Sequence, residues 1–94
     1  MKVIERIDPE ILKRVKDTRE FTYADGALPR KFKFLIGMAL DAAQGAEQGV
    51  KTLAQEALQA GATKQEMAEA LRVAYYICGA VSTFTAARGL KEIF

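Results

Sequence analysis

The block ALQAGATKQEMAEALR, residues 57–72, decides the fold because it ends one helix and begins the next. Gly61 is typical of the residue just past a helix C-terminus, where glycine takes the left-handed backbone conformation without steric strain. Thr63 and Glu66 have the spacing of a capping box, in which two side chains satisfy free N–H groups at the start of a helix. The block therefore predicts a tight turn that joins two helices.

Small and apolar residues continue the helices on both sides of this turn. Upstream they recur on one predicted helix face, at Ala46, Val50, Leu53, Ala57 and Ala60. Downstream they step by four, three and four residues along a predicted core stripe, at Met67, Leu71, Ala74 and Cys78. Gly79 then predicts a bend before a last helical stretch over about residues 80–92.

The first half of the chain predicts two more helices. Asp8 is a good N-cap and Pro9 suits the first helical position, so a helix is expected from here to about Arg19. The segment TYADGALPR, residues 22–30, carries turn residues. The helix expected over residues 29–43 is apolar nearly all round, which is typical of a buried helix.

No segment has the alternating pattern of a strand, so we expect an all-α fold of about five helices around a central antiparallel pair. The chain has 94 residues and reads as a single domain, residues 1–94, with an N-terminal helix and turn at 1–27. A chain this short buries only about 60–65% of the surface that it exposes when unfolded. Half of its residues are hydrophobic, concentrated at 32–40 and 73–84. We therefore expect the surplus apolar surface to be buried in a homo-oligomer.

Charge and composition exclude several classes of protein. Residues 1–33 hold nine Lys/Arg against six Asp/Glu, interleaved as on a solvated helix face, so no nucleic acid partner is expected. The longest apolar run, residues 34–40, is too short for a membrane span, and the start MKVIERIDPE lacks the apolar core of a signal peptide. A single cysteine and no histidine argue against a disulfide scaffold and a zinc site. We expect a cytoplasmic protein without a metal or other cofactor.

Three segments together carry a resemblance to a known family. They are LPRK at residues 28–31, the block at 57–72, and YYICGA at 75–80. Over residues 28–90 the chain resembles the carboxymuconolactone decarboxylase family, which includes the AhpD-like alkylhydroperoxidases. The resemblance implies an AhpD-like helical domain with its family core at 28–90, assembled into trimers or hexamers.

Many members of that family carry a CxxC motif followed by a histidine, with a glutamate one helix earlier. The two thiols cycle through a disulfide, while the glutamate and histidine relay protons. Aligned on Gly61-Ala62, the four family positions fall on Ala46, Gly49, Leu53 and Phe34. None of these side chains transfers a proton or forms a sulfenic acid. The resemblance therefore implies the site helix of the family without its thiol relay.

Four other residues are candidates for a pocket or ligand site, namely Arg72, Tyr75, Tyr76 and Cys78. An arginine can bind a carboxylate bidentately, and a tyrosine hydroxyl can donate a proton. The alternative for each is structural: an ion pair or solvent for the arginine, packing for the tyrosines, and a small buried hydrophobe for the cysteine. Asp41 and Glu47 flank the aligned site, but their spacing across a glycine junction fixes no geometry.

Three hypotheses on function follow. The first is a family protein without thiol peroxidase activity that binds a small molecule or serves in assembly. The second is an enzyme with non-standard residues, either a decarboxylase or lactone-type enzyme acting on a small carboxylic acid or a peroxiredoxin-like antioxidant protein. In the second case Arg72 would hold the carboxylate and Tyr75 or Tyr76 would donate the proton. The third is a structural partner of a catalytic paralogue in a mixed ring.

Overall fold

The computed structural model describes all 94 residues and is entirely helical, as the sequence predicts. Its six helices are α1 (Lys2–Ile7), α2 (Pro9–Tyr23), α3 (Arg30–Ala43), α4 (Glu47–Gln59), α5 (Lys64–Cys78) and α6 (Ala80–Leu90). The expected count of about five is low by one, because a short helix precedes Asp8. None of the helices is long and apolar enough to cross a membrane.

The helix boundaries follow the capping signals in the sequence. Asp8 accepts a hydrogen bond from the Ile11 backbone N–H at 3.2 Å and starts α2. The capping box of α5 is complete, with Thr63 and Glu66 each accepting a backbone N–H bond from the other, at 3.0 and 2.9 Å. The Thr63 N–H and then the Lys31 ammonium hold the pKa of Glu66 below its ordinary value. Gly61 has the left-handed φ of +99° that the predicted turn requires.

The first long helix runs further than its sequence signals suggest. It was expected to end near Arg19, but α2 continues to Tyr23. The residues between, including Thr22, have no strong helix-stopping character, so the helix ends only where Ala24 becomes extended. This extension moves Tyr23 from the predicted turn onto a helix.

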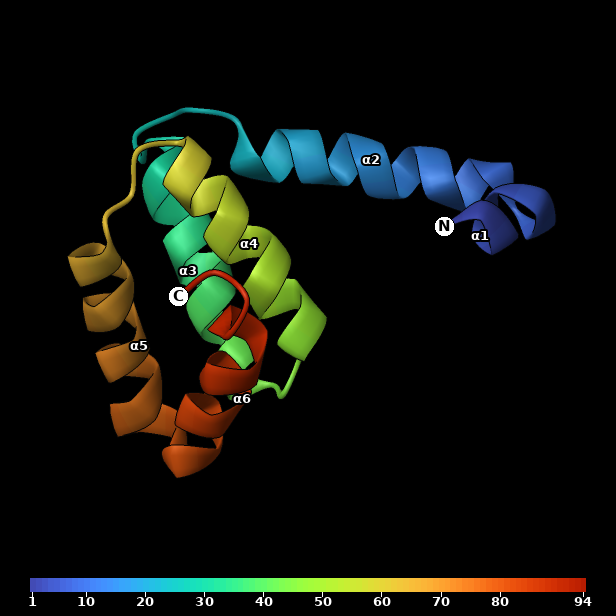
Figure 1. The fold of residues 1–94 in the computed structure, drawn as a ribbon. Helices are drawn as coiled ribbons and strands as arrows, with labels where there is room; N and C mark the ends of the chain where they lie inside the picture. The colour runs from blue at the N-terminus through green and yellow to red at the C-terminus, as the bar shows by residue number, and fades with distance from the viewer.

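Helices α3 to α6 form the body of the molecule, and α3 and α4 lie side by side as an antiparallel pair joined by a short turn (Figure 1). The core is small, since only 14 of the 94 residues are buried. Its largest fully buried side chains are Met38 from α3, Val50 from α4 and Met67 from α5. The small side chains of α6 let that helix approach α4 closely.

Two expectations of burial are wrong for the single chain. Helix α3 was expected to be buried all round, but Ile36 and Leu40 are 49% and 59% exposed, and only the face with Leu35, Met38 and Ala42 is buried. Cys78 was placed on the core stripe of α5, but it is exposed at the end of that helix. Both departures leave apolar surface on the same side of α3 and α5.

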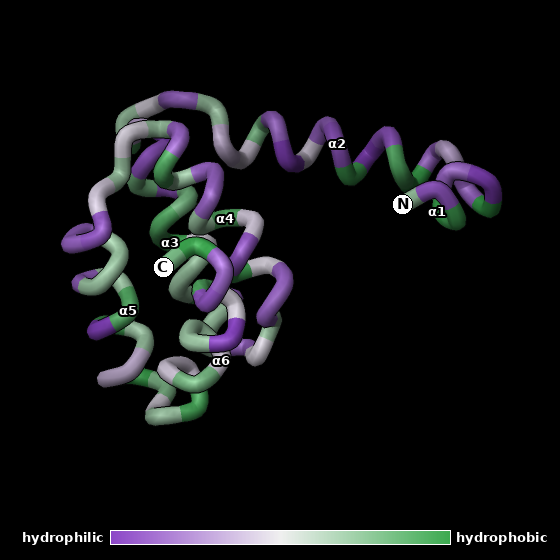
Figure 2. Tube along the Cα trace, in the orientation of Figure 1, coloured by the Kyte–Doolittle hydropathy of each residue, from purple (hydrophilic) through white to green (hydrophobic).

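Helices α1 and α2 extend away from the body as an arm, residues 2–23 (Figure 1). No residue of either helix is buried, and hydrophobic and hydrophilic residues alternate along the arm (Figure 2). The radius of gyration is 14.1 Å, against about 12.4 Å for a compact chain of this length. The accessible surface is 6558 Å², against about 5,400 Å² for a compact monomer of this mass.

Gly89 tests how tightly α6 packs on α4. A Cβ at this position would lie 2.8 Å from the Glu47 carbonyl oxygen and 2.9 Å from the Val50 side chain. We expect Gly89→Ala to lower the free energy of unfolding by about 1–3 kcal/mol, because a backbone atom cannot move aside cheaply. Urea denaturation monitored by circular dichroism measures the loss.

Gly26→Ala is the matched control for this prediction. A Cβ there meets nothing within 4 Å, and Gly26 does not have a positive φ. The free energy of unfolding of the Gly26→Ala variant should be unchanged or slightly higher. Equal effects of the two substitutions would contradict the close packing of α6 on α4.

Candidate functional site

The four positions that align with the family site lie around the contact between α3 and α4. Phe34 is half-buried on α3, and Ala46 is the N-cap of α4. Gly49 and Leu53 follow on α4, one turn apart, with Leu53 buried. The fold therefore brings these positions near the same helix pair, but with side chains that carry no acid, base or thiol.

Other side chains fill the space beside these positions. The carboxylate of Asp41 lies directly against Gly49, where a Cβ would be 2.8 Å from Asp41 Cγ. One turn earlier on α3, a Cβ on Gly37 would lie 2.8 Å from the Tyr23 hydroxyl and 2.9 Å from Leu53 Cδ1. The two glycines thus make room for an aspartate and a tyrosine rather than for an open pocket.

Tyr23 joins the arm to the body. Its ring stacks on that of Phe34, with centroids 4.8 Å apart and planes at 29°. Arg19 lies four residues earlier on α2, on the same side of the helix, and its guanidinium is 5.1 Å from the centre of the Tyr23 ring. Both oxygens of Glu56 on α4 accept hydrogen bonds from Arg19. Arg19, Tyr23, Asp41 and Glu56 together form what we call the polar cluster.

The surroundings of Tyr23 raise the pKa of its phenol above the ordinary value of 10.0. Partial burial is the main cause, and the carboxylates of Asp41 and Glu56 add to it against the opposing effect of Arg19. At neutral pH the phenol keeps its proton and can donate a hydrogen bond, and the carboxylates of Asp41 and Glu56 lie near it. Such a group can donate a proton or bind a polar ligand, but it does not replace a pair of thiols.

The sequence analysis did not identify Tyr23 because it predicts that this helix ends near Arg19, whereas the helix continues to Tyr23. The signal that could have found it is the four-residue spacing from Arg19, which places both side chains on one face once the helix is extended. The contact of Asp41 with Gly49 has no comparable sequence signal, since it joins two helices.

The remaining candidates lie on α5, away from the aligned positions. Arg72 is exposed, and Tyr75 and Tyr76 are 55% and 88% exposed. Cys78 borders a groove of about 310 Å³ between α3 and α5, which we call the apolar groove. Its lining is hydrophobic throughout: Ile36, Ala39, Leu40, Ala43, Ala70, Val73, Ala74, Ile77 and Cys78. The structure does not bring Arg72 or either tyrosine into this groove with the thiol.

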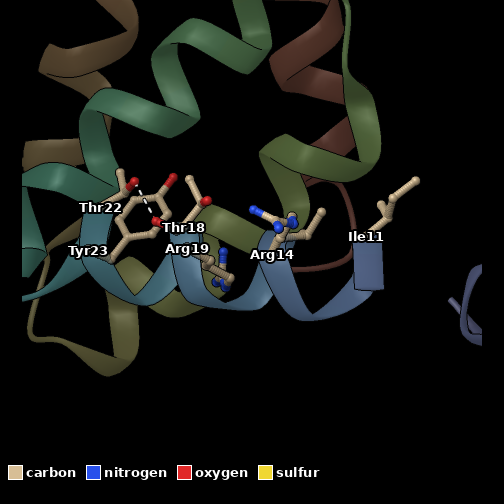
Figure 3. A pocket seen from close by; sticks show the side chains of 7 residues that line it. Ile11, Arg14, Thr18, Arg19, Thr22 and Tyr23 are labelled. Carbon is tan, nitrogen blue, oxygen red and sulfur yellow. Dashed lines mark hydrogen bonds between the residues drawn. The ribbon is translucent and has the colours of Figure 1, made fainter. Parts of the chain in front are cut away.

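The arm carries a second hollow, of about 590 Å³, on one face of α2 (Figure 3). Its lining comes from α2 alone: Ile11, Arg14, Val15, Thr18, Arg19, Thr22 and Tyr23. The Thr22 hydroxyl donates a hydrogen bond to the Thr18 carbonyl oxygen at 2.7 Å, so it is satisfied within the helix. With one helix as its only wall, this hollow is open on its other sides. No three side chains of the metal-ligating types come together anywhere in the chain.

This architecture, a small helical domain on an antiparallel pair, matches known proteins. A sequence model of the carboxymuconolactone decarboxylase family matches residues 9–92, and the chain belongs to that family. The crystal structure of the apo form of a carboxymuconolactone decarboxylase family protein from Legionella pneumophila is similar, with a TM-score of 0.88 and 30% identity. The similarity covers 96% of this chain and 80% of that one. No curated protein matches the sequence significantly.

The charges around Tyr23 are tested by titrating its phenol. In a Tyr75→Phe/Tyr76→Phe background, Tyr23 is the only tyrosine, so ultraviolet absorbance reports it alone. We expect Asp41→Asn to lower the pKa of Tyr23, because it removes a negative charge. Arg19→Gln should raise that pKa, because it removes the positive charge that opposes burial.

A related effect should appear in the stability of the protein. Because the pKa of Tyr23 is raised in the folded state, the unfolded chain loses this proton first, and stability should fall as the pH rises above about 10. Tyr23→Phe should remove this part of the pH dependence. In the titration, changes of the Tyr23 pKa in the same direction in Asp41→Asn and Arg19→Gln would contradict this arrangement of charges.

Proposed function

We propose that this member of the carboxymuconolactone decarboxylase family lacks thiol peroxidase activity and acts as a homo-oligomeric binding or assembly protein. The observation that carries the proposal is the content of the aligned site. Ala46, Gly49 and Leu53 stand where the resemblance places the two thiols and the imidazole, and Asp41 and Tyr23 pack into the adjoining space.

The one thiol of the chain is not a substitute for that site. A reactive thiolate is normally stabilised by a nearby positive charge or a helix N-terminus. Cys78 is the last residue of α5, one residue before the Gly79 N-cap of α6, and the groove beside it contains no basic side chain. A second thiol to resolve a sulfenic acid is absent from the sequence.

The exposed apolar surface supports the oligomer. Beyond Ile36 and Leu40, the exposed large hydrophobic residues include Tyr76 and Ile77 near the end of α5 and Phe84 on α6. The accessible surface exceeds that of a compact monomer by about 1,200 Å², while a standard interface buries about 800 Å² on each partner. A trimer or hexamer would cover such a surface.

Tyr23 favours a second candidate function, which is acid–base chemistry on a small carboxylic acid. A hollow of about 360 Å³ beside it is lined by Lys16, Arg19, Glu20, Tyr23, Ala24, Arg30 and Phe34. Arg19 is already paired with Glu56, so Lys16 and Arg30 would hold the carboxylate, and the neutral phenol would be the proton donor. The titration of Tyr23 decides this candidate: benzoate bound there would raise the pKa of the phenol, and an unchanged pKa at saturating benzoate would exclude it.

Loss of peroxidase activity is tested with an alkyl hydroperoxide and a dithiol reductant. We expect the protein to consume peroxide no faster than an equal concentration of free cysteine, because it has no resolving thiol. Cys78→Ser should abolish the remaining reaction. Turnover that persists in Cys78→Ser, or that clearly exceeds the thiol background, would contradict the proposal.

Assembly is tested by sedimentation equilibrium over a range of protein concentrations. We expect a defined oligomer, and we expect Ile77→Glu to shift it toward monomer because a charge would be buried in the interface. Ile77 is 72% exposed in the single chain, so circular dichroism of this variant should be unchanged. Thr52→Glu, on the exposed face of α4, is the control and should leave the mass unchanged. A wild-type monomer would contradict the proposal.

A further inference from the structure

We propose that the arm of one copy of this chain packs into the apolar groove of a second copy. The inference rests on the homo-oligomer proposed above and names the two surfaces that form it. Each surface is incomplete alone, and a second copy supplies what the first lacks.

The arm is a helix without enough partners of its own. An isolated helix of this length is marginally stable in water, and α2 has no buried residue. Ile11 and Val15, four residues apart, are 49% and 46% exposed and line the hollow on α2 together with Thr18 and Thr22, while Arg14 and Arg19 line its flanks. Ile11, Thr18 and Thr22 project from the same side of the helix (Figure 3). This is the i, i+4, i+7, i+11 face with which a helix packs on a neighbour.

The apolar groove, by contrast, is a concave surface whose two walls are α3 and α5. Alanines from both walls, including Ala39 and Ala74, leave room for the backbone of a third helix to come close. Ile36 and Ile77 border it and are 49% and 72% exposed. The lining contains no charged side chain, so the complementary occupant is a helix face with an uncharged, partly apolar centre. On α2 that centre is formed by Ile11 and Val15, and Arg14 and Arg19, which flank it, would stay at the rim of the groove.

The arm of the same chain does not reach this groove. Figure 1 shows α2 leaving the body on the side away from α5. The stacking of Tyr23 on Phe34 and the ion pair between Arg19 and Glu56 hold the arm in that direction. The contact must therefore join two copies. Every arm and every groove is filled when two copies exchange arms about a two-fold axis, or when the contact repeats around an axis and closes a ring.

The native cysteine beside the groove makes the contact testable by disulfide crosslinking. We would introduce Ile11→Cys or Val15→Cys into the chain, oxidise the assembled protein and identify the linked peptides by mass spectrometry. We expect a disulfide between the new cysteine and Cys78, with a ladder of linked chains on a non-reducing gel. Lys13→Cys and Glu20→Cys, on the other side of α2, are the controls and should give several-fold less product.

A mixed experiment establishes that the disulfide joins different chains. A tagged chain with Val15→Cys and Cys78→Ser is co-expressed with the wild-type chain, which keeps its Cys78. We expect one crosslinked species that contains one chain of each kind. Ile11 and Val15 are half-exposed in the single chain, so neither substitution should prevent folding, and circular dichroism checks this.

The other outcomes overturn the inference in distinct ways. A Cys78–Cys78 disulfide as the main product would show that the groove pairs with its own copy. An intrachain link from position 11 or 15 to Cys78 would show that the arm folds back. Equal crosslinking at all four arm positions, or none, in a protein that sediments as an oligomer would overturn the inference and leave the proposed assembly intact. A monomer in sedimentation would overturn both.

Discussion

The structure depends on α3, the helix that packs against four others: α2, α4, α5 and α6. Its sequence is apolar nearly all round, but its own chain covers only part of this surface, and the side with Ile36 and Leu40 stays exposed. Leu35 and Met38 enter the core, Gly37 and Asp41 face the contact with Tyr23 and α4, and Leu40 borders the apolar groove. A charged substitution in the middle of this helix would disturb the core, the polar cluster or the groove, depending on the face it occupies.

The aligned positions are occupied and surrounded by side chains that pack against one another. A cysteine at Gly49 would need the space that the Asp41 carboxylate occupies, and a larger residue at Gly37 would displace the Tyr23 hydroxyl. Restoring the thiols alone would therefore force Asp41 to move, and the imidazole position would still be taken by Leu53, which is buried against its neighbours. The difference from the thiol relay that the resemblance implies therefore extends to the neighbours of the aligned positions.

Much of the fold could be predicted because its signals are local. Asp8, Gly61 and the Thr63–Glu66 pair each act within a few residues, and all three boundaries agree with the structure. The polar cluster could not be predicted in this way, since Tyr23, Asp41 and Glu56 come from three helices and meet only through tertiary packing. The wrong prediction that α3 is buried all round has another cause. An apolar helix face indicates burial, but the sequence does not say whether its own chain or another chain buries it.

Apolar surface that only another copy can cover affects the stability of the protein. With 14 buried residues, the body has a thin core, and the arm adds conformational entropy cost without fully burying any side chain. An interface that covers Ile11 and Val15 would offset this cost only in the assembled state, so folding of the arm and association would be coupled. Stability would then rise with protein concentration, as mass action requires for any partner that binds the folded state alone. In such a protein the contact between copies would be part of the fold, and the surplus of hydrophobic residues in a 94-residue chain would follow from that requirement.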